Sequence, residues 1–172
     1  LFAIVLLKPP TSKVTTALIG FVGLLSVITS ANSAWEIQRS AAEDVSGLDT
    51  LLDRTTMGSR LVTLSFREHS GRNHFPPWVH VGSYHRNNRG GVAAFSFAEL
   101  NHWPMQYRAE NAPPKKPIPF WDFHPCLFRN AVDGAYYDYV LVRGRLDPFR
   151  DAPPGPRFRS IGKAHDFTLY EK

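Results

Sequence analysis

The sequence predicts an α/β domain, with an α+β arrangement left open, that follows a membrane-spanning helix. Residues 14–35 carry no charged side chain, residues 36–57 place apolar residues at helical spacing, and several later runs are rich in β-branched and aromatic residues. A helix followed by an apolar strand typically starts a layered arrangement of helices on a sheet. We therefore expect a membrane helix, an amphipathic helix and then a small mixed sheet with helices packed on it.

The uncharged stretch from Val14 to Trp35 is long enough to cross a bilayer. Crossing the hydrocarbon core takes roughly 20 mostly apolar residues, because each residue adds about 1.5 Å of helix. A helix also satisfies its own backbone hydrogen bonds, so that lipid can surround it. We expect residues 14–35 to form a transmembrane helix and the lipid bilayer to be a partner of the chain.

Three other interpretations of this stretch stay open. A buried helix of a soluble domain would seldom remain uncharged for so long. A cleaved secretory signal would use the small residues Ala31-Asn-Ser33 as its cleavage site, although a second apolar run, residues 1–7, lies before the lysines. An interfacial helix would need a charged face, which is missing from these residues.

The residues before the stretch predict its orientation. Residues 1–7 fit the end of a preceding membrane helix, and residues 8–13, with two lysines and two prolines, fit a short loop. Lysines in short loops favour the cytoplasmic side. The expected order is the end of one span, a cytoplasmic loop, a span at residues 14–35 and an extracytoplasmic domain at residues 36–172.

Composition restricts the partners of the domain. Lys8 and Lys13 account for two of the 20 basic residues, so 18 basic and 15 acidic residues lie after residue 35, a net charge of +3. The basic residues are scattered rather than gathered on one regular face, so we expect no nucleic-acid partner. The single cysteine cannot form an internal disulfide and therefore indicates no particular redox compartment.

The amphipathic helix is predicted by apolar residues that recur three or four positions apart: Ile37, Ala41, Val45, Leu48 and Leu52. We expect this helix to end near Met57-Gly58. Gly47 weakens it by up to about 1 kcal/mol relative to alanine and is an expected bend.

Four later runs predict strands: residues 61–66, residues 92–97 (or the start of a short helix), residues 136–142, and residues 167–170, where Phe167 and Leu169 share a face. The third run is almost continuously apolar, which indicates a central strand covered on both faces. We expect Val140 and Val142 to be buried on one face and Tyr139 and Leu141 on the other. Prolines at residues 113–119 and 148–156 predict short rigid connectors.

The residues that most often carry chemistry show no catalytic pattern. The seven histidines lack the spacing of a zinc site: His69, His74, His80, His85, His102, His124 and His165. We expect them to be scattered polar or loop residues, with His80 and His85 in a loop, and we expect no metal and no other cofactor. Cys126 is expected to be a small buried residue. Asp122, Asp133 and Asp138 adjoin aromatic residues, but no catalytic residue can be chosen among them.

One segment has the composition of an anion-binding turn. Arg86-Asn-Asn-Arg-Gly-Gly91 is rich in hydrogen-bond donors and glycine, so its backbone could approach a phosphate; a plain glycine turn is the alternative. Aromatic side chains in this part of the chain suit sugar stacking, with core packing as the alternative. The candidate anion- or sugar-binding residues are Arg86, Arg89, Gly90, Gly91, Trp78 and Tyr84; Trp103, Tyr107 and Trp121 are further aromatic candidates.

Three short motifs together resemble a known group of proteins. A Gly-Ser-Arg introduces a strand at residues 58–60, Tyr-Asp-Tyr-Val-Leu-Val occupies residues 137–142, and Phe-Thr-Leu-Tyr occupies residues 167–170. The chain resembles the C-terminal extracytoplasmic domain of large bacterial multi-span membrane proteins. Those proteins are similar to lipid-linked-sugar-dependent glycosyltransferases and are largely uncharacterised. The resemblance implies that the chain lies in the inner (cytoplasmic) membrane of a bacterium. The resemblance covers most of the chain, through motifs that are mostly structural.

The resemblance implies a non-catalytic role for this domain. In such transferases the catalytic carboxylates lie in early extracytoplasmic loops, which would precede the residues present here. The domain would then cover or stabilise a membrane-embedded active site or contact the acceptor, with a lipid-linked sugar and its acceptor as partners. Whether the parent protein is an enzyme stays open. The alternative is a membrane-anchored, non-enzymatic binding or assembly domain.

Overall fold

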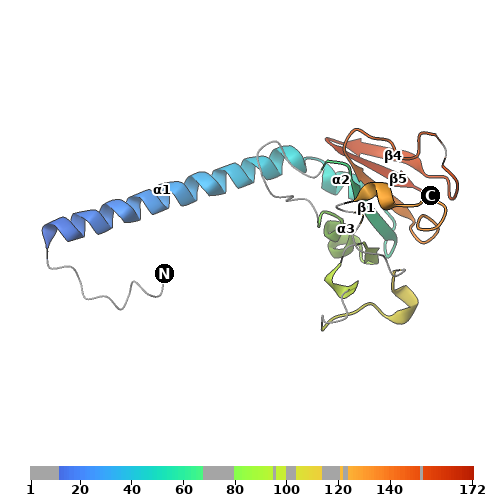
Figure 1. The fold of residues 1–172 in the computed structure, drawn as a ribbon, viewed down its shortest axis with the longest axis horizontal. Coiled ribbons are helices and arrows are strands. Elements are labelled where there is room, and N and C mark those ends of the chain that lie inside the picture. Colours follow the sequence, from blue (N-terminus) through green and yellow to red (C-terminus); the bar gives the residue numbers. More distant parts are fainter. Residues whose placement is uncertain are drawn as a thin grey trace. The chain divides into compact units, whose positions relative to one another are not determined.

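The structure, a computed structural model, describes residues 12–67, 80–94, 96–99, 104–113, 121, 124–151 and 153–172. The chain divides into two compact units, Leu1–Ala41 and Ala42–Lys172. The first unit holds most of one long helix, and the second holds a sheet with its covering elements (Figure 1).

Helix α1 (Lys13–Asp44) is 32 residues long and leaves its apolar side chains exposed. It is long and apolar enough to cross a membrane, and no residue of its apolar window is buried within the described chain. Two of its hydroxyls are satisfied inside the helix: Ser26 Oγ donates to Val22 O (2.9 Å) and Thr29 Oγ1 donates to Leu25 O (3.0 Å). The exposed apolar surface does not support a buried core helix. A secretory signal has the same properties, so that interpretation stands.

The amphipathic helix is shorter than expected. α1 ends at Asp44, and a separate helix α2 (Leu48–Leu52) follows Gly47, whose φ of 74° lies in the left-handed region. The bend expected at Gly47 is confirmed, whereas the expected end near Met57-Gly58 is wrong because α2 stops at Leu52. Leu48, Leu51 and Leu52 of α2 are all buried.

In the described residues, five strands form one mixed sheet in the order β2-β1-β3-β5-β4. The strands are β1 (Arg60–Ser65), β2 (Val92–Ala93), β3 (Tyr139–Arg143), β4 (Arg159–Ala164) and β5 (Phe167–Glu171). β1 is parallel to β2 and to β3, while β5 is antiparallel to both of its neighbours. A mixed sheet with helices on it is therefore confirmed.

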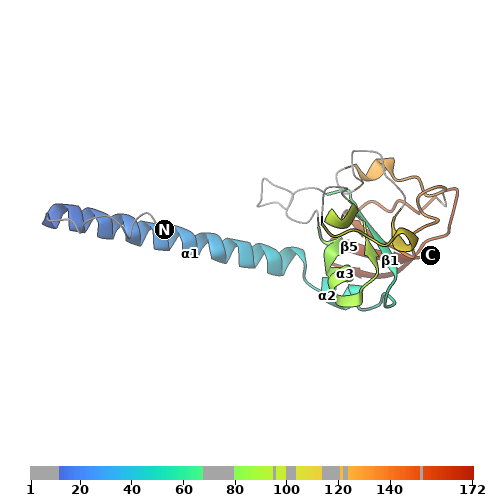
Figure 2. The same ribbon diagram turned by 90° about the horizontal axis from the view of Figure 1, so that it is seen from below.

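The central strand β3 is buried on both faces, as its sequence predicted. Tyr139 and Leu141 belong to the core cluster that includes the leucines of α2, with Phe167 and Leu169 on the same face. Val140 and Val142 belong to the opposite cluster, which contains Trp121, Tyr137 and Phe158. Helices thus cover one face of the sheet, and irregular segments after β2 and β3 cover the other (Figure 2).

Helix α3 (Gly82–Arg89) was not predicted, and the loop expected around His85 is wrong. Its first residue lies against β1, because a Cβ on Gly82 would be 2.7 Å from Thr63 Oγ1. His85 is fully buried on this helix. Short 3-10 helices complete the fold: η1 (Phe97–Glu99), η2 (Ala109–Asn111) and η3 (Pro125–Leu127).

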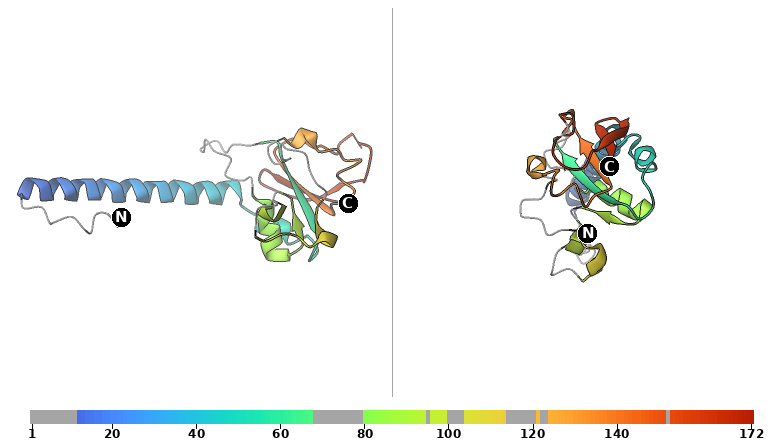
Figure 3. Two further views of the ribbon diagram at one scale, coloured as in Figure 1. Left: turned by 60° about the horizontal axis from the view of Figure 1, so that its bottom comes forward. Right: turned by 90° about the vertical axis from the view of Figure 1, so that its right-hand side faces the viewer.

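The remaining strands differ from expectation at their ends. The run at residues 92–97 becomes a two-residue strand followed by η1, and β3 starts at Tyr139 because residues 131–136 form turns. The outer strand β4 was missed; all six of its residues are exposed or half-buried on the sheet edge (Figure 3).

Candidate functional site

The glycine pair predicted to approach an anion has a backbone role. Gly90 and Gly91 have φ values of 71° and 78°, which only glycine adopts readily. A Cβ on Gly91 would lie 2.1 Å from the carbonyl oxygen of Ser59. The close approach lets Val92 N donate to Ser59 O (3.2 Å), so the pair directs the chain into β2 beside β1.

The two arginines of the same segment already have partners. Arg86 Nη1 donates to the hydroxyl of Ser96. Arg89 Nη2 lies 3.0 Å from Asp53 Oδ1 and also donates to the Asp53 carbonyl. Both guanidinium groups therefore connect α3 to its neighbours, and an anion would have to bind alongside these contacts. Tyr84 is exposed on α3, and Trp78 lies outside the described residues. Anion or sugar binding by this segment stays a prediction.

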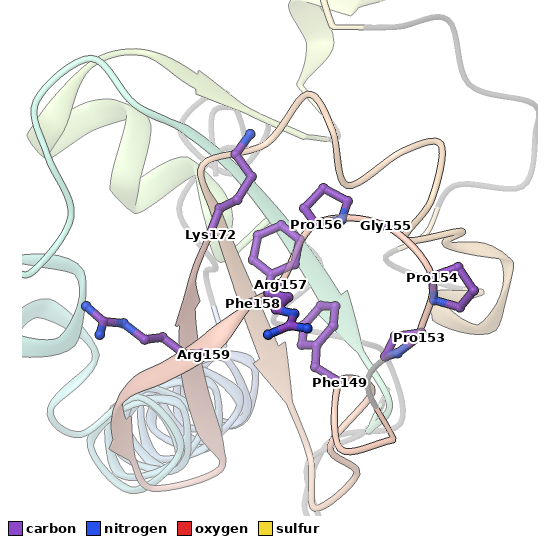
Figure 4. Close-up of a pocket in the computed structure, with 9 residues that line it drawn as sticks. All are labelled: Phe149, Pro153, Pro154, Gly155, Pro156, Arg157, Phe158, Arg159 and Lys172. Carbon is purple, nitrogen blue, oxygen red and sulfur yellow. The ribbon is translucent and has the colours of Figure 1, made fainter.

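A cleft of about 760 Å³ lies over the segment that was predicted to be a connector. Its lining residues are drawn in Figure 4: Phe149, Pro153, Pro154, Gly155, Pro156, Arg157, Phe158, Arg159 and Lys172. We call it the proline-loop cleft. The rings of Phe149 and Phe158 pack with centroids 4.9 Å apart, and Phe149 also packs on Tyr170. The cleft therefore has an aromatic wall that is continuous with the core.

Asn130 fixes the proline-rich wall of this cleft. Its Nδ2, with two N–H groups, lies within hydrogen-bond distance of the carbonyl oxygens of Pro153 (3.3 Å), Pro154 (3.1 Å) and Pro156 (2.9 Å). Gly155 has a φ of 117°, and a Cβ there would lie 2.7 Å from the Cα of Ala131. Because proline has no N–H, its carbonyl is the backbone group left to bond. The buried amide thus holds a loop that has few other hydrogen bonds available.

Two of the three cations that line the proline-loop cleft, Arg159 and Lys172, point away from its aromatic rings. Arg159 lies 3.4 Å from Glu171 Oε2, and Lys172 Nζ donates to Ala135 O (3.0 Å). Figure 4 shows that the side chain of Arg159 extends away from the two rings and that Lys172 points to another side. Among the described residues, the lining side chains include no carboxylate, hydroxyl, thiol or imidazole. Aromatic rings with cations suit noncovalent binding.

The described histidines do not form a metal site. No group of three or more His, Cys, Asp or Glu side chains in the described part of the chain could hold a metal ion. His80, His124 and His165 are exposed, while His69, His74 and His102 lie outside the described residues. Cys126 is exposed, so its expected burial is wrong. The 3-10 turn η3 turns this side chain outward while burying Pro125.

His85 is a buried structural residue. Its Nε2 lies 3.1 Å from Ser59 O and its Nδ1 lies 3.0 Å from Thr55 Oγ1. A carbonyl only accepts, so Nε2 carries the hydrogen of the neutral ring. Burial lowers the pKa of His85, the Ser59 hydrogen bond opposes this, and the positive charge of Arg89 adds to the lowering. The imidazole thus links α3 to the turn before β1.

The candidate carboxylates and aromatic residues have structural partners. Asp133 Oδ2 accepts from Arg129 N (2.7 Å), Asp138 pairs with Arg60 (2.8 Å), and Asp122 lies outside the described residues. Trp121 is buried against Phe128 and Tyr137, which is the core-packing alternative. Tyr107 donates to Ala93 O (3.3 Å). Trp103, like Trp78, lies outside the described residues.

Comparisons with protein-family models, curated proteins and solved structures find no match to this chain.

Proposed function

We propose that this chain is the C-terminal part of a bacterial polytopic inner-membrane protein that resembles lipid-linked-sugar-dependent glycosyltransferases. α1 supports the membrane part of the proposal, and the three short motifs at residues 58–60, 137–142 and 167–170 support the resemblance. At about 1.5 Å per residue its 32 residues are about 48 Å long, more than the roughly 30 Å of a hydrocarbon core. The exposure of its apolar side chains supports a lipid environment.

The proposed side of the membrane follows from charge. Lys8 and Lys13 lie before the apolar stretch, and Glu36, Glu43 and Asp44 lie after it. Lysines of short loops favour the cytoplasm, which supports an extracytoplasmic location for the second unit.

The proposed role of the second unit is binding without catalysis. The proline-loop cleft offers aromatic rings and cations. This lining suits contacts to an acceptor or to a lipid-linked sugar, while the chemistry takes place elsewhere in the parent protein. The same cleft also favours the alternative, a membrane-anchored binding or assembly domain without enzymatic function. The two differ in the sequence encoded upstream of residue 1: further spans with acidic residues in the first outer loop support the transferase.

Cys126 provides the test of topology, since it is the single cysteine of the chain and is exposed. In intact bacterial cells expressing the chain, a membrane-impermeant maleimide should label Cys126. The matched variant Ser12→Cys/Cys126→Ser moves the thiol to the residue before α1, on the expected cytoplasmic side. This variant should be labelled only after the cells are lysed. Labelling of Cys126 only after lysis would place the second unit in the cytoplasm and contradict the proposal.

The non-catalytic role is tested in the full-length parent protein. Alanine at His80, His124 or Cys126 should leave turnover within about tenfold of wild type, which corresponds to about 1.4 kcal/mol on the barrier. A thousandfold loss from one of them, with unchanged expression and melting temperature, would place part of the active site in this unit.

A further inference from the structure

The strand order reverses between the neighbouring strands β1 and β3. The strand that follows β1 in sequence, β2, lies toward one edge of the sheet, and the strands that follow β3, β4 and β5, lie toward the opposite edge. β1 and β3 are parallel and adjacent, so their carboxyl ends lie at the same edge. In open α/β sheets this switch point, at the carboxyl ends of the strands, is where ligands usually bind.

Arg143, the last residue of β3, lies at this point and is only 1% exposed. It is paired in register with Ser65, the last residue of β1. Its Nη1 donates to the carbonyl of Arg67 (2.9 Å), which also accepts from Ser65 Oγ (3.0 Å). The strand ends therefore fix one nitrogen of the guanidinium.

The other edge of the same guanidinium lacks a hydrogen-bond partner. Nε and Nη2 of Arg143 are both buried, and neither has an acceptor among the residues that the structure describes. These two N–H groups are parallel and lie on one side of the planar group, the geometry that binds two oxygens of one oxyanion. Buried polar atoms nearly always have a partner, so an unsatisfied pair on a charged group indicates a missing acceptor.

The charges around Arg143 are close to balanced. Burial lowers the pKa of Arg143, while the carboxylates of Asp44 and Asp166 raise it and the charge of Arg67 lowers it further. Arg67 itself forms an ion pair with Asp166. An arginine keeps its charge in proteins, so the group remains a cation. Because two cations already face two anions, geometry rather than excess positive charge would select the ligand, and a singly charged group fits best.

We propose that Nε and Nη2 of Arg143 form an oxyanion-binding site at the carboxyl ends of β1 and β3, which takes a carboxylate or a phosphodiester group in a two-oxygen contact. The ring of Phe167 covers one side of the guanidinium group, with its centroid 5.8 Å from the guanidinium carbon. The proposal rests on the β1–β3 junction alone and does not depend on the membrane role or on the proline-loop cleft.

The test uses the full chain in a neutral detergent at constant ionic strength. Acetate and dimethyl phosphate are the two probes, and chloride is the reference. At least one probe should raise the melting temperature of the wild-type chain saturably. A response to acetate alone assigns a carboxylate, and a response to dimethyl phosphate alone assigns a phosphodiester. No shift with either probe would overturn the site.

Arg143→Lys is the informative variant, because it keeps the charge and can still reach the Arg67 carbonyl but lacks the two-donor edge. Its apparent affinity for the effective probe should fall at least tenfold. Arg129→Lys, on an exposed arginine, is the matched control and should respond as wild type does. An unchanged response of Arg143→Lys would contradict the proposal.

A second measurement applies even where Arg143→Lys does not fold. In the wild-type chain, the Nε–H of a buried arginine is protected from exchange and should give a resolved nuclear magnetic resonance signal. This signal should move during titration with the effective probe. Saturable stabilisation without movement of a protected arginine Nε–H would place the probe elsewhere and overturn the assignment.

Discussion

Arg60 and Asp138 hold the amino-terminal ends of β1 and β3 together through reciprocal hydrogen bonds. Asp138 Oδ2 accepts from the backbone N (2.9 Å) and Nε (3.1 Å) of Arg60, and Oδ1 accepts from its Nη2 (2.8 Å). In return, Asp138 N donates to Arg60 O (2.9 Å). The guanidinium also lies over the ring of Tyr136, 4.8 Å from its centroid. A carboxylate that sequence alone left as a catalytic candidate thus sets the register of two parallel strands.

Asp138→Asn should destabilise the second unit by about 1–2 kcal/mol at pH 7. The loss is smaller than for a buried ion pair, because both side chains are about one-third exposed and water screens their charges. Burial raises the pKa of Asp138, but the hydrogen bonds and charge of Arg60 and the charge of Lys172 outweigh it, so the pKa is lowered overall. The stabilisation by Asp138 is therefore fully present above the pKa of the unfolded chain, near 3.9. It is lost as the pH falls through the lower pKa of the folded chain. Denaturant melts between pH 7 and pH 2 measure it. Asp151→Asn, at an exposed position, is the control; equal losses for both variants would refute the role of Asp138.

Leu141→Ala should cost about 2–5 kcal/mol, because it leaves a cavity in a fully buried site at the centre of β3. The matched control is Leu146→Ala, which removes the same atoms from a side chain that is 52% exposed and should change stability by less than about 0.5 kcal/mol. Thermal or denaturant melts of the full chain provide the comparison. Similar melting temperatures for the two variants would show that β3 is not central.

Comparing Gly91→Ala with Gly90→Ala separates the cost of backbone strain from the cost of a steric clash. Both positions have positive φ, so each variant should lose about 1–2 kcal/mol from backbone strain. A Cβ at Gly91 would clash with the carbonyl oxygen of Ser59, whereas a Cβ at Gly90 would have no atom within 4 Å. Gly91→Ala should therefore be less stable than Gly90→Ala by at least about 1 kcal/mol. A reversed order in melting experiments would contradict the close approach of β2 to Ser59.

His85 should make the second unit less stable in mild acid. Its folded pKa is lowered, mainly by burial, so below about pH 6.5 the unfolded chain binds a proton that the folded chain does not. Stability should fall as pH drops from about 6.5 towards the lower folded pKa and stay constant above that range. Melting temperatures at pH 7.5 and 5.5 measure the effect. His85→Gln should flatten the profile, while His124→Gln, at an exposed position, should keep it; a wild-type profile without slope would contradict the burial of a neutral imidazole.

The strongest sequence predictions were those with a single physical cause. The alternation from Tyr139 to Val142 reflects burial on both faces, and both faces are buried as expected. The bend at Gly47 was likewise predicted, because glycine weakens a helix and adopts the positive φ found there at little steric cost. The spacing of apolar residues could not predict where α1 ends and α2 begins, because this spacing continues across the bend at Gly47.

The elements that sequence reasoning missed depend on tertiary contacts. α3 contains glycine and two asparagines and has no apolar stripe; it forms where Gly82 fits against Thr63 and where His85 is buried. β4 lies at an edge and lacks an alternating apolar pattern, so pairing with β5 defines it. Arg143 has the sequence signature of a solvent-exposed strand terminus, and its burial follows from what the neighbouring strand ends place around it.

The position of β5 sets the order in which the second unit can assemble during synthesis. β5 follows every other strand along the chain, yet it pairs with both β3 and β4. Until residues 167–171 emerge from the ribosome or the translocation channel, β3 offers an open edge and Leu141 lacks its partner Leu169. An apolar edge of this kind is prone to pair with other chains. The second unit therefore stays open to such pairing until translation reaches β5, although α1 is synthesised long before.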